Sequence, residues 1–250
     1  MQLSVAGPGP AAPFLRARDR FETAFDLELP VSVQVRADPD ERTWAAHHDD
    51  HHVLNISRAA ASSAMAAELA LHEFAHMRRF EEGHPSHRQQ TAEALYLGLA
   101  GHEVERRKLS HCHQIANHMK DIYADDITVD VAPGDKLAAF FESELADALS
   151  DRPVGRPPSW TRLTPAADPD ITAINAAFAL ALLERHDLVE PEHRLYDLAS
   201  VAAADAPAVD LGAFRERFRG LVEAPGESEY RRQLVDAVRE YAIPEPRAAD

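Results

Sequence analysis

The chain of 250 residues has little of what several common protein chemistries require. It contains a single cysteine, Cys112, so no disulfide can form within it. It has no glycine-rich nucleotide-binding motif, no G-x-S-x-G sequence and no paired C-x-x-C, which argues against the chemistries that depend on those motifs. No apolar run reaches the roughly 18 residues of a membrane helix, and the N-terminus lacks the basic and apolar regions of a secretory signal. We therefore expect a soluble, cytoplasmic protein.

Lysine is also scarce, and positive charge is in deficit. Only three of the 26 basic residues are lysines, and 42 acidic residues give a formal net charge of −16. Nucleic acids and anionic membranes require a positive surface, so neither is an expected partner. This acidic, alanine-rich and lysine-poor composition resembles that of proteins from salt-loving archaea, in which molar salt screens the self-repulsion.

The most informative feature that is present is an H-E-x-x-H motif at residues 72–76. Residues four apart lie on the same face of a helix, so His72 and His76 can direct their imidazoles at one point. Two neutral imidazoles at that spacing can bind zinc, and Glu73 can take a proton from a water on the same metal. The surrounding segment, residues 58–77, is apolar on all sides, which is typical of a buried helix. Burying histidine and glutamate there without partners is costly, and a metal removes that cost.

At these residues the chain resembles the zincin metallopeptidases. The resemblance extends over residues 50–126, and it implies one Zn²⁺ per chain and hydrolysis of a peptide or protein substrate. In that mechanism Glu73 acts first as general base and then as general acid. The metzincin continuation of the motif is excluded, because Arg79 and Glu82 stand where a glycine and a third histidine would be.

A third metal ligand is required, because catalytic zinc usually has three protein ligands and a water. Residues 121–125 read D-x-x-A-D, which resembles the gluzincin pattern E-x-x-A-D with aspartate in place of glutamate. The resemblance predicts Asp121 as the third ligand and Asp125 as a partner that hydrogen-bonds a metal-bound histidine. Glu103 and His118 are alternative ligands. Four side chains are candidates for stabilising the oxyanion of the transition state: Tyr123, His118, His193 and Tyr196.

The hydrophobic pattern predicts an α+β fold that is mostly helical. A zincin-like core would combine a small N-terminal antiparallel sheet with a helix beginning after Ser57, and a helical C-terminal half would follow. We predict a catalytic domain over residues 1–150, a proline-rich linker over 151–167 and a helical region over 168–250. The expected strands are Leu29–Arg36, Thr43–Ala46, Val53–Ile56 and a brief Thr128–Val131, and the expected helices include 88–100, 102–109, 113–127, 133–149 and 169–185.

The short strand Val53–Ile56 is predicted to form an exposed edge of the sheet. In zincins an extended peptide pairs with the edge strand beside the active-site helix, and a polar run, residues 47–52, precedes this strand. Two other functions fit the sequence. One is zinc-dependent hydrolysis of a small amide, and the other is a non-catalytic helical interaction protein in which H-E-x-x-H arises by accident.

The charge balance predicts a dependence of stability on salt. With a formal charge of −16, the native state repels itself in dilute buffer, and added ions screen that repulsion. We expect the melting temperature to rise steadily as KCl increases from about 0.1 M to molar levels. Thermal unfolding followed by circular dichroism measures this, and a flat or falling curve would contradict the halophilic interpretation.

Overall fold

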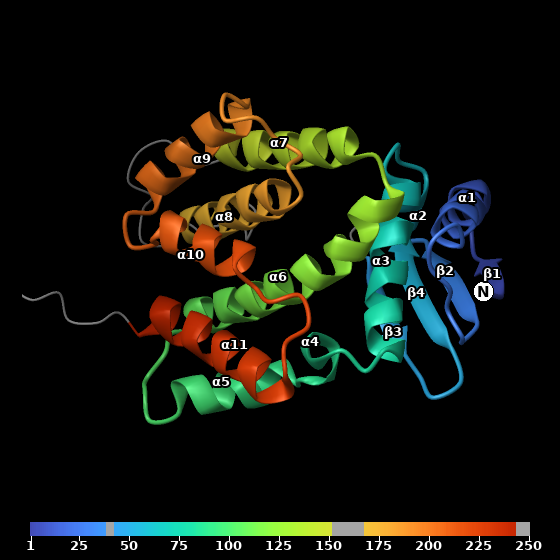
Figure 1. The fold of residues 1–250 in the computed structure, drawn as a ribbon. Helices are drawn as coiled ribbons and strands as arrows, with labels where there is room; N and C mark the ends of the chain where they lie inside the picture. The colour runs from blue at the N-terminus through green and yellow to red at the C-terminus, as the bar shows by residue number, and fades with distance from the viewer. Residues whose placement is uncertain (39–42, 152–167, 244–250) are drawn as a thin grey trace, which may run out of the picture. The chain divides into compact units, whose positions relative to one another are not determined.

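A computed structural model describes residues 1–38, 43–151 and 168–243 of the chain (Figure 1). The fold is α+β and mostly helical, as predicted. Backbone contacts group the chain into two compact units, Met1–Arg88 with Tyr123–Ala132, and Gln89–Ile122 with Pro133–Asp250. This grouping differs from the predicted division at a linker, most of which (152–167) lies outside the described residues. In the described ranges no helix is both long and apolar enough to cross a bilayer.

The first unit contains a four-stranded mixed sheet. Its strands are β1 (Leu3–Ala6), β2 (Val31–Arg36), β3 (Trp44–His47) and β4 (His52–Ser57), in the spatial order β1-β2-β4-β3. β1, β2 and β4 run parallel, and only β3 is antiparallel to its neighbour. The predicted antiparallel sheet was therefore wrong. The sequence reading missed β1, from which helix α1 (Ala12–Phe21) crosses over to make β2 parallel.

The predicted edge strand Val53–Ile56 is not at an edge. It lies within β4, which pairs with β2 on one side and with β3 on the other. Leu54 and Ile56 on one face and Asn55 on the other are fully buried, as in a strand covered on both faces. The polar run that suggested an exposed edge is instead the hairpin between β3 and β4. The antiparallel edge of the sheet is β3, where Trp44 is 46% exposed.

The motif lies on α3 (Ala66–Glu81), which packs in the core of the first unit. The Ser57 side chain accepts a hydrogen bond from the backbone N–H of Ala60 and so caps the short helix α2 (Arg58–Ala61) that precedes α3. On α3, Leu71 and Phe74 are fully buried. They join α1, the sheet and the C-terminal part of α6 (Arg106–Val131) in one hydrophobic cluster.

Gly83 ends this part of the fold with a left-handed backbone conformation, φ +67°. Glycine adopts that conformation without steric cost, which is why it commonly follows a helix. The backbone N–H of His84 then bonds to the Arg79 carbonyl, and the chain turns back into the short helix α4 (Pro85–Arg88). This turn brings α4 against the C-terminal half of α3.

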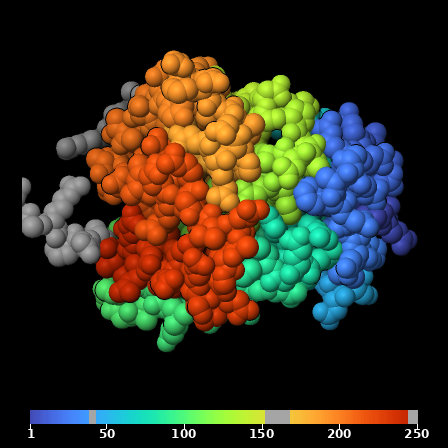
Figure 2. Space-filling view, in the orientation of Figure 1, coloured from blue at the N-terminus to red at the C-terminus, as the bar shows by residue number. Residues whose placement is uncertain are grey.

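The second unit is a group of helices around α8 (Pro169–Arg185), which has the bounds predicted from the sequence. Its side chains are buried on nearly every side, and it contacts three neighbouring helices. On the face seen in Figure 2, the orange and red helices of this unit form a continuous surface. The other helices of this unit are α5 (Thr91–Leu99), the first part of α6, α7 (Gly134–Ser150), α9 (Arg194–Asp205), α10 (Leu211–Arg219) and α11 (Glu227–Ala242).

Three predictions from the sequence were wrong in the region of helix α6. The segments 102–109 and 113–127 were expected as separate helices and Thr128–Val131 as a strand, but residues 106–131 form one continuous helix of 26 residues. The β-branched residues near its end pack against the first unit's core, and that packing outweighs their preference for strands.

A polar cluster, buried except for Arg107 and the partly exposed Asp170, joins three helices of the second unit. Arg107 on α6 makes two hydrogen bonds, of 2.6 and 2.7 Å, to the carboxylate of Asp168, which caps α8. His111 Nε2 lies 3.2 Å from the same carboxylate, and the Tyr241 hydroxyl of α11 donates to Asp170. Burial raises the pKa of Asp168, but the bonds from Arg107 and His111 outweigh it and hold that pKa well below its ordinary value.

The lowered pKa of Asp168 predicts how stability depends on pH. A carboxylate with a depressed folded-state pKa stabilises the fold above about pH 4, and this contribution is lost as the pH falls toward the folded pKa. Asp168→Asn removes the charge and keeps a capping oxygen. We expect the variant to be about 2 kcal/mol less stable than the wild type at about pH 7, with the difference shrinking below about pH 4.

Urea unfolding at several pH values measures this difference. Asp236→Asn, on an exposed position of α11, is the matched control and should leave the free energy of unfolding nearly unchanged. A difference between Asp168→Asn and the wild type that stays constant down to about pH 3 would show that the charge of Asp168 is not what matters.

Candidate metal centre

Helix α3 brings both motif histidines to one point. The Nε2 atoms of His72 and His76 lie 3.0 Å apart, and the two rings are nearly perpendicular. Their spacing of one helical turn produces this convergence. The opposite face of α3, with Phe74 and Met77, is fully buried and fixes the rotation of the helix. The rings therefore point away from the core toward a common position.

The other nitrogen of His72 is held by a carboxylate. His72 Nδ1 lies 2.7 Å from Asp125 Oδ1, and Asp125 is only 4% exposed. The sequence analysis predicted that Asp125 would support one of the motif histidines, and in the structure it contacts His72. A carboxylate that accepts the Nδ1 proton fixes the ring orientation and makes Nε2 a stronger ligand.

The other nitrogen of His76 is held by a histidine that the sequence analysis did not select. His76 Nδ1 lies 2.7 Å from His87 Nε2, and His87 is placed there by α4. From the sequence alone, His84 and His87 follow the end of the motif helix and would be assigned to a loop. The available signal was the close spacing of two histidines immediately after the helix-ending Gly83.

Asp121, the predicted third ligand, lies on α6 in the last turn that belongs to the second unit. The division between the two units falls inside α6, just after Ile122, so Asp121 is one turn before Asp125 on a continuous helix. His118, one turn earlier, lies 3.6 Å from the Asp121 carboxylate.

The donor set and its spacing fit zinc. Two nitrogens bound to one zinc ion at about 2.0–2.1 Å in tetrahedral geometry lie about 3.3 Å apart, close to the 3.0 Å between His72 Nε2 and His76 Nε2. Each Nδ1 is engaged by a separate partner, so each ring directs its Nε2 at the same position. Two imidazoles and a carboxylate are ligands that zinc accepts.

Glu73 differs from the other acidic residues around it. It is 7% exposed, and its carboxylate has no hydrogen-bond or ion-pair partner in the part of the chain that the structure describes. Its oxygens are not among the fully buried side-chain atoms that lack a partner, so the carboxylate still reaches solvent. A proton acceptor beside a metal needs a carboxylate that is accessible and not committed to another group.

The two alternative ligands, Glu103 and His118, both belong to the second unit. Glu103 is exposed in the segment before α6, where the sequence analysis had expected a helix. His118 is buried in the second unit, stacked on Phe178, with its Nε2 2.8 Å from Asn175 Oδ1.

The candidates for the oxyanion-stabilising role are placed as follows. Tyr123 is fully buried, with its ring centroid 4.5 Å from that of His84. His193 caps α9 through the backbone N–H of Leu195, and the Tyr196 hydroxyl donates to Glu184. Both residues of α9 belong to the second unit.

A second group of possible metal ligands occurs in the second unit, at His111, Asp168 and Asp170. Arg107 already donates two hydrogen bonds to Asp168 and lies 3.4 Å from Asp170. Its guanidinium neutralises the carboxylates from the position that a metal ion would need, so we interpret this group as a structural cluster.

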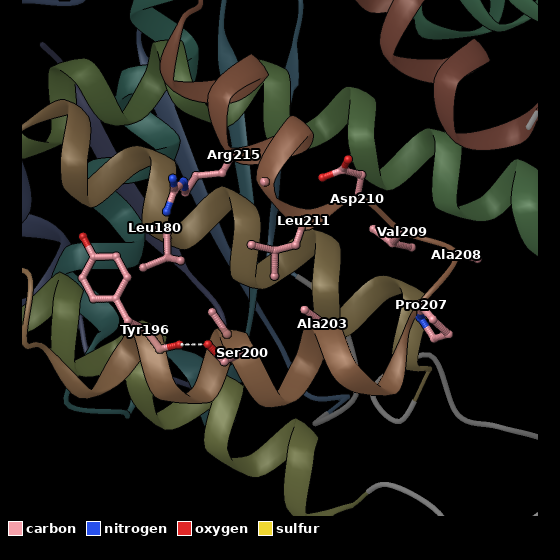
Figure 3. Close-up of a pocket in the computed structure, with 12 residues that line it drawn as sticks. Leu180, Tyr196, Ser200, Ala203, Pro207, Ala208, Val209, Asp210, Leu211 and Arg215 are labelled. Carbon is pink, nitrogen blue, oxygen red and sulfur yellow. Dashed lines mark hydrogen bonds between the residues drawn. The ribbon is translucent and has the colours of Figure 1, made fainter. Parts of the chain in front are cut away.

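The second unit also contains a pocket of about 540 Å³ between α8, α9 and α10 (Figure 3). Its polar groups are used by the fold. The Ser200 hydroxyl donates to the Tyr196 carbonyl, and Asp210 accepts from the backbone N–H of Ala213 at the start of α10. No histidine lines the pocket, so it has neither a metal-ligand set nor a serine–histidine pair.

Comparison with known proteins identifies a family but no function. Residues 1–243 match the protein family described as "Family of unknown function (DUF5781)". The chain belongs to this family. No curated protein and no solved structure matches it significantly. The match covers α3, α4 and α6, so the candidate metal centre lies within the part of the chain that defines the family.

The geometry of the centre predicts about one zinc ion per chain in the purified protein. His72→Ala and His76→Ala should each lose most of that zinc, because each removes a nitrogen ligand. His113→Ala, at an exposed position of α6, is the matched control and should keep it. Metal analysis by mass spectrometry measures the content. Full zinc retention in the double variant would refute the site and leave the interaction-protein interpretation.

The same measurement separates Asp121 from Glu103. Asp121→Ala should weaken zinc binding sharply, whereas Glu103→Ala should leave it unchanged because that side chain is exposed and lies outside the D-x-x-A-D pattern. Asp125→Ala should weaken binding by only about 10- to 100-fold, as expected for a residue that supports a ligand. The reverse order for Asp121 and Glu103 would reassign the third ligand.

Proposed function

We propose that this protein is a zinc-dependent hydrolase that cleaves amide bonds, with His72, His76 and Asp121 as the metal ligands. One observation carries the proposal. The two Nε2 atoms face each other at 3.0 Å while each Nδ1 is held by its own partner. The 3.0 Å separation is also a hydrogen-bond distance, but if both Nδ1 atoms carry a proton then both Nε2 atoms are acceptors, and a cation between them removes their mutual repulsion.

Glu73 is assigned the proton transfers. Zinc in such a site supplies a water of lowered pKa and polarises the substrate carbonyl. Glu73 takes the proton from the attacking water and then delivers it to the nitrogen of the leaving amine. Its position next to His72 in sequence, its burial and its uncommitted carboxylate support this assignment.

A peptide is the preferred substrate class, and β3 is the strand on which it would dock. β3 is the free antiparallel edge among the described strands, and unpaired backbone groups at an edge can pair with an added strand. β3 also lies beside the motif helix, since the His47 ring stacks on Phe80 of α3 with centroids 4.4 Å apart. The docking strand first predicted, Val53–Ile56, is interior and is not proposed again.

A small amide is the second candidate substrate. The interior position of β4 favours it, because the strand directly before the motif helix offers no free edge to a peptide. Both candidates share the zinc chemistry and differ only in how the substrate is held. Turnover of denatured casein compared with a panel of short acylated amides distinguishes them.

The assigned role of Glu73 predicts the behaviour of Glu73→Gln. This variant should bind zinc as the wild type does, since Glu73 is not a ligand, but hydrolysis should fall on the order of 10²-fold or more. Glu103→Gln, which alters an exposed glutamate, is the control and should retain both properties. Zinc lost together with activity would mean that Glu73 has been given the wrong role.

A further inference from the structure

A chain of four hydrogen-bonded side chains begins at the candidate metal ligand His76. His76 Nδ1 lies 2.7 Å from His87 Nε2, and His87 Nδ1 lies 2.8 Å from the Ser86 hydroxyl. That hydroxyl lies 2.7 Å from His84 Nδ1. Ser86 is fully buried and His84 nearly so, which shields these bonds from water. We call this chain, His76–His87–Ser86–His84, the histidine relay.

The direction of the relay is set at its far end by the backbone. The N–H of Ser86 contacts His84 Nδ1 at 3.3 Å, and a backbone N–H can only donate. His84 Nδ1 therefore carries a lone pair. In the contact between the Ser86 hydroxyl and His84 Nδ1, the hydroxyl must therefore be the donor. The backbone N–H and the side-chain O–H of Ser86 thus both donate to His84 Nδ1.

The remaining protons follow one from another. The Ser86 hydroxyl already donates its only proton to His84, so His87 Nδ1 must donate to the Ser86 oxygen. A neutral imidazole carries one proton, so His87 Nε2 is an acceptor and His76 Nδ1 must donate to it. His76 then has its proton on Nδ1 and its lone pair on Nε2, the nitrogen that faces His72.

His72 has the same tautomer as His76, for a different reason. The Asp125 carboxylate accepts from its Nδ1, which leaves a lone pair on Nε2. Both histidines therefore turn lone pairs toward one position, which is the tautomer that a metal requires. The carboxylate of Asp125 fixes the tautomer of His72. The tautomer of His76 is fixed by uncharged side chains, the last of which accepts from a backbone N–H.

We propose that Ser86 and His84 are positioning residues that act through His87 to hold His76 in the Nδ1–H tautomer, ready to bind metal through Nε2. The proposal rests on the proposed zinc site. It concerns which nitrogen of the neutral His76 ring carries the proton. It also means that the turn at Gly83 and helix α4, which position Ser86 and His87, contribute to metal binding.

The test is a measurement of histidine tautomers in the full chain after zinc has been removed with a chelator. Long-range ¹H–¹⁵N spectra at about pH 8, where most histidines are neutral, distinguish a protonated ring nitrogen from an unprotonated one. In the wild type we expect His76 protonated at Nδ1 and bare at Nε2. A wild-type His76 protonated at Nε2, or an equal mixture, overturns the proposal without any variant being needed.

Variants test whether the tautomer of His76 depends on the histidine relay. In Ser86→Ala, His87 loses its acceptor, so His76 should become a mixture of tautomers and zinc affinity should fall about 10- to 100-fold, measured by chelator competition. Ser110→Ala is the matched control, because its exposed hydroxyl bonds only to a carbonyl of its own helix. An unchanged tautomer and affinity in Ser86→Ala overturns the relay.

The outcomes also separate the relay from the proposed function. If the wild type binds zinc tightly but His76 lacks the expected tautomer, the relay fails and the metal site stands. If His76 has the expected tautomer but the chain binds no zinc, the hydrogen-bond directions are upheld and the proposed hydrolase is rejected.

Discussion

The contact between His72 and Asp125 is the interaction on which the candidate centre depends. It joins the motif helix to α6 across the core of the first unit, with the Asp125 side chain buried and the His72 side chain partly exposed. A charged hydrogen bond in such surroundings is strong when made and costly when one partner is missing. It therefore fixes the rotation of α3 and α6 together, and the position of Asp121 follows from that rotation.

Much of the fold was predictable because its signals are local. The bounds of α8 were predicted correctly, and Ser57 was predicted as a helix cap, although it caps the short helix α2 rather than the motif helix. The failures have non-local causes. Whether β4 is central or at an edge depends on β1, β2 and β3, which are distant in sequence, and the end of α6 is helical because it packs in the core of the first unit.

In the candidate centre, too, some residues could be predicted from the local sequence and others required the structure. The spacing of His72 and His76 is a property of one helix, so the sequence alone was enough to pair them. Asp125 could be expected from its own spacing to Asp121, but which histidine it would contact required the structure. His87 was missed because nothing in its local sequence shows that the chain reverses at Gly83 and returns to His76.

The continuity of α6 limits how this protein can change in length. Each residue of a helix advances the rotation by about 100°, so one inserted residue would turn everything beyond it away from its partners. In α6 such an insertion just after Asp125 would turn either Asp125 away from His72 or Ile127 out of the core, because both belong to the first unit and only one of them could keep its partners. Insertions or deletions that preserve both the carboxylates and the apolar face must come in steps of about seven residues, or two full turns. Changes in length are accordingly far easier to accommodate in the loops than within this helix.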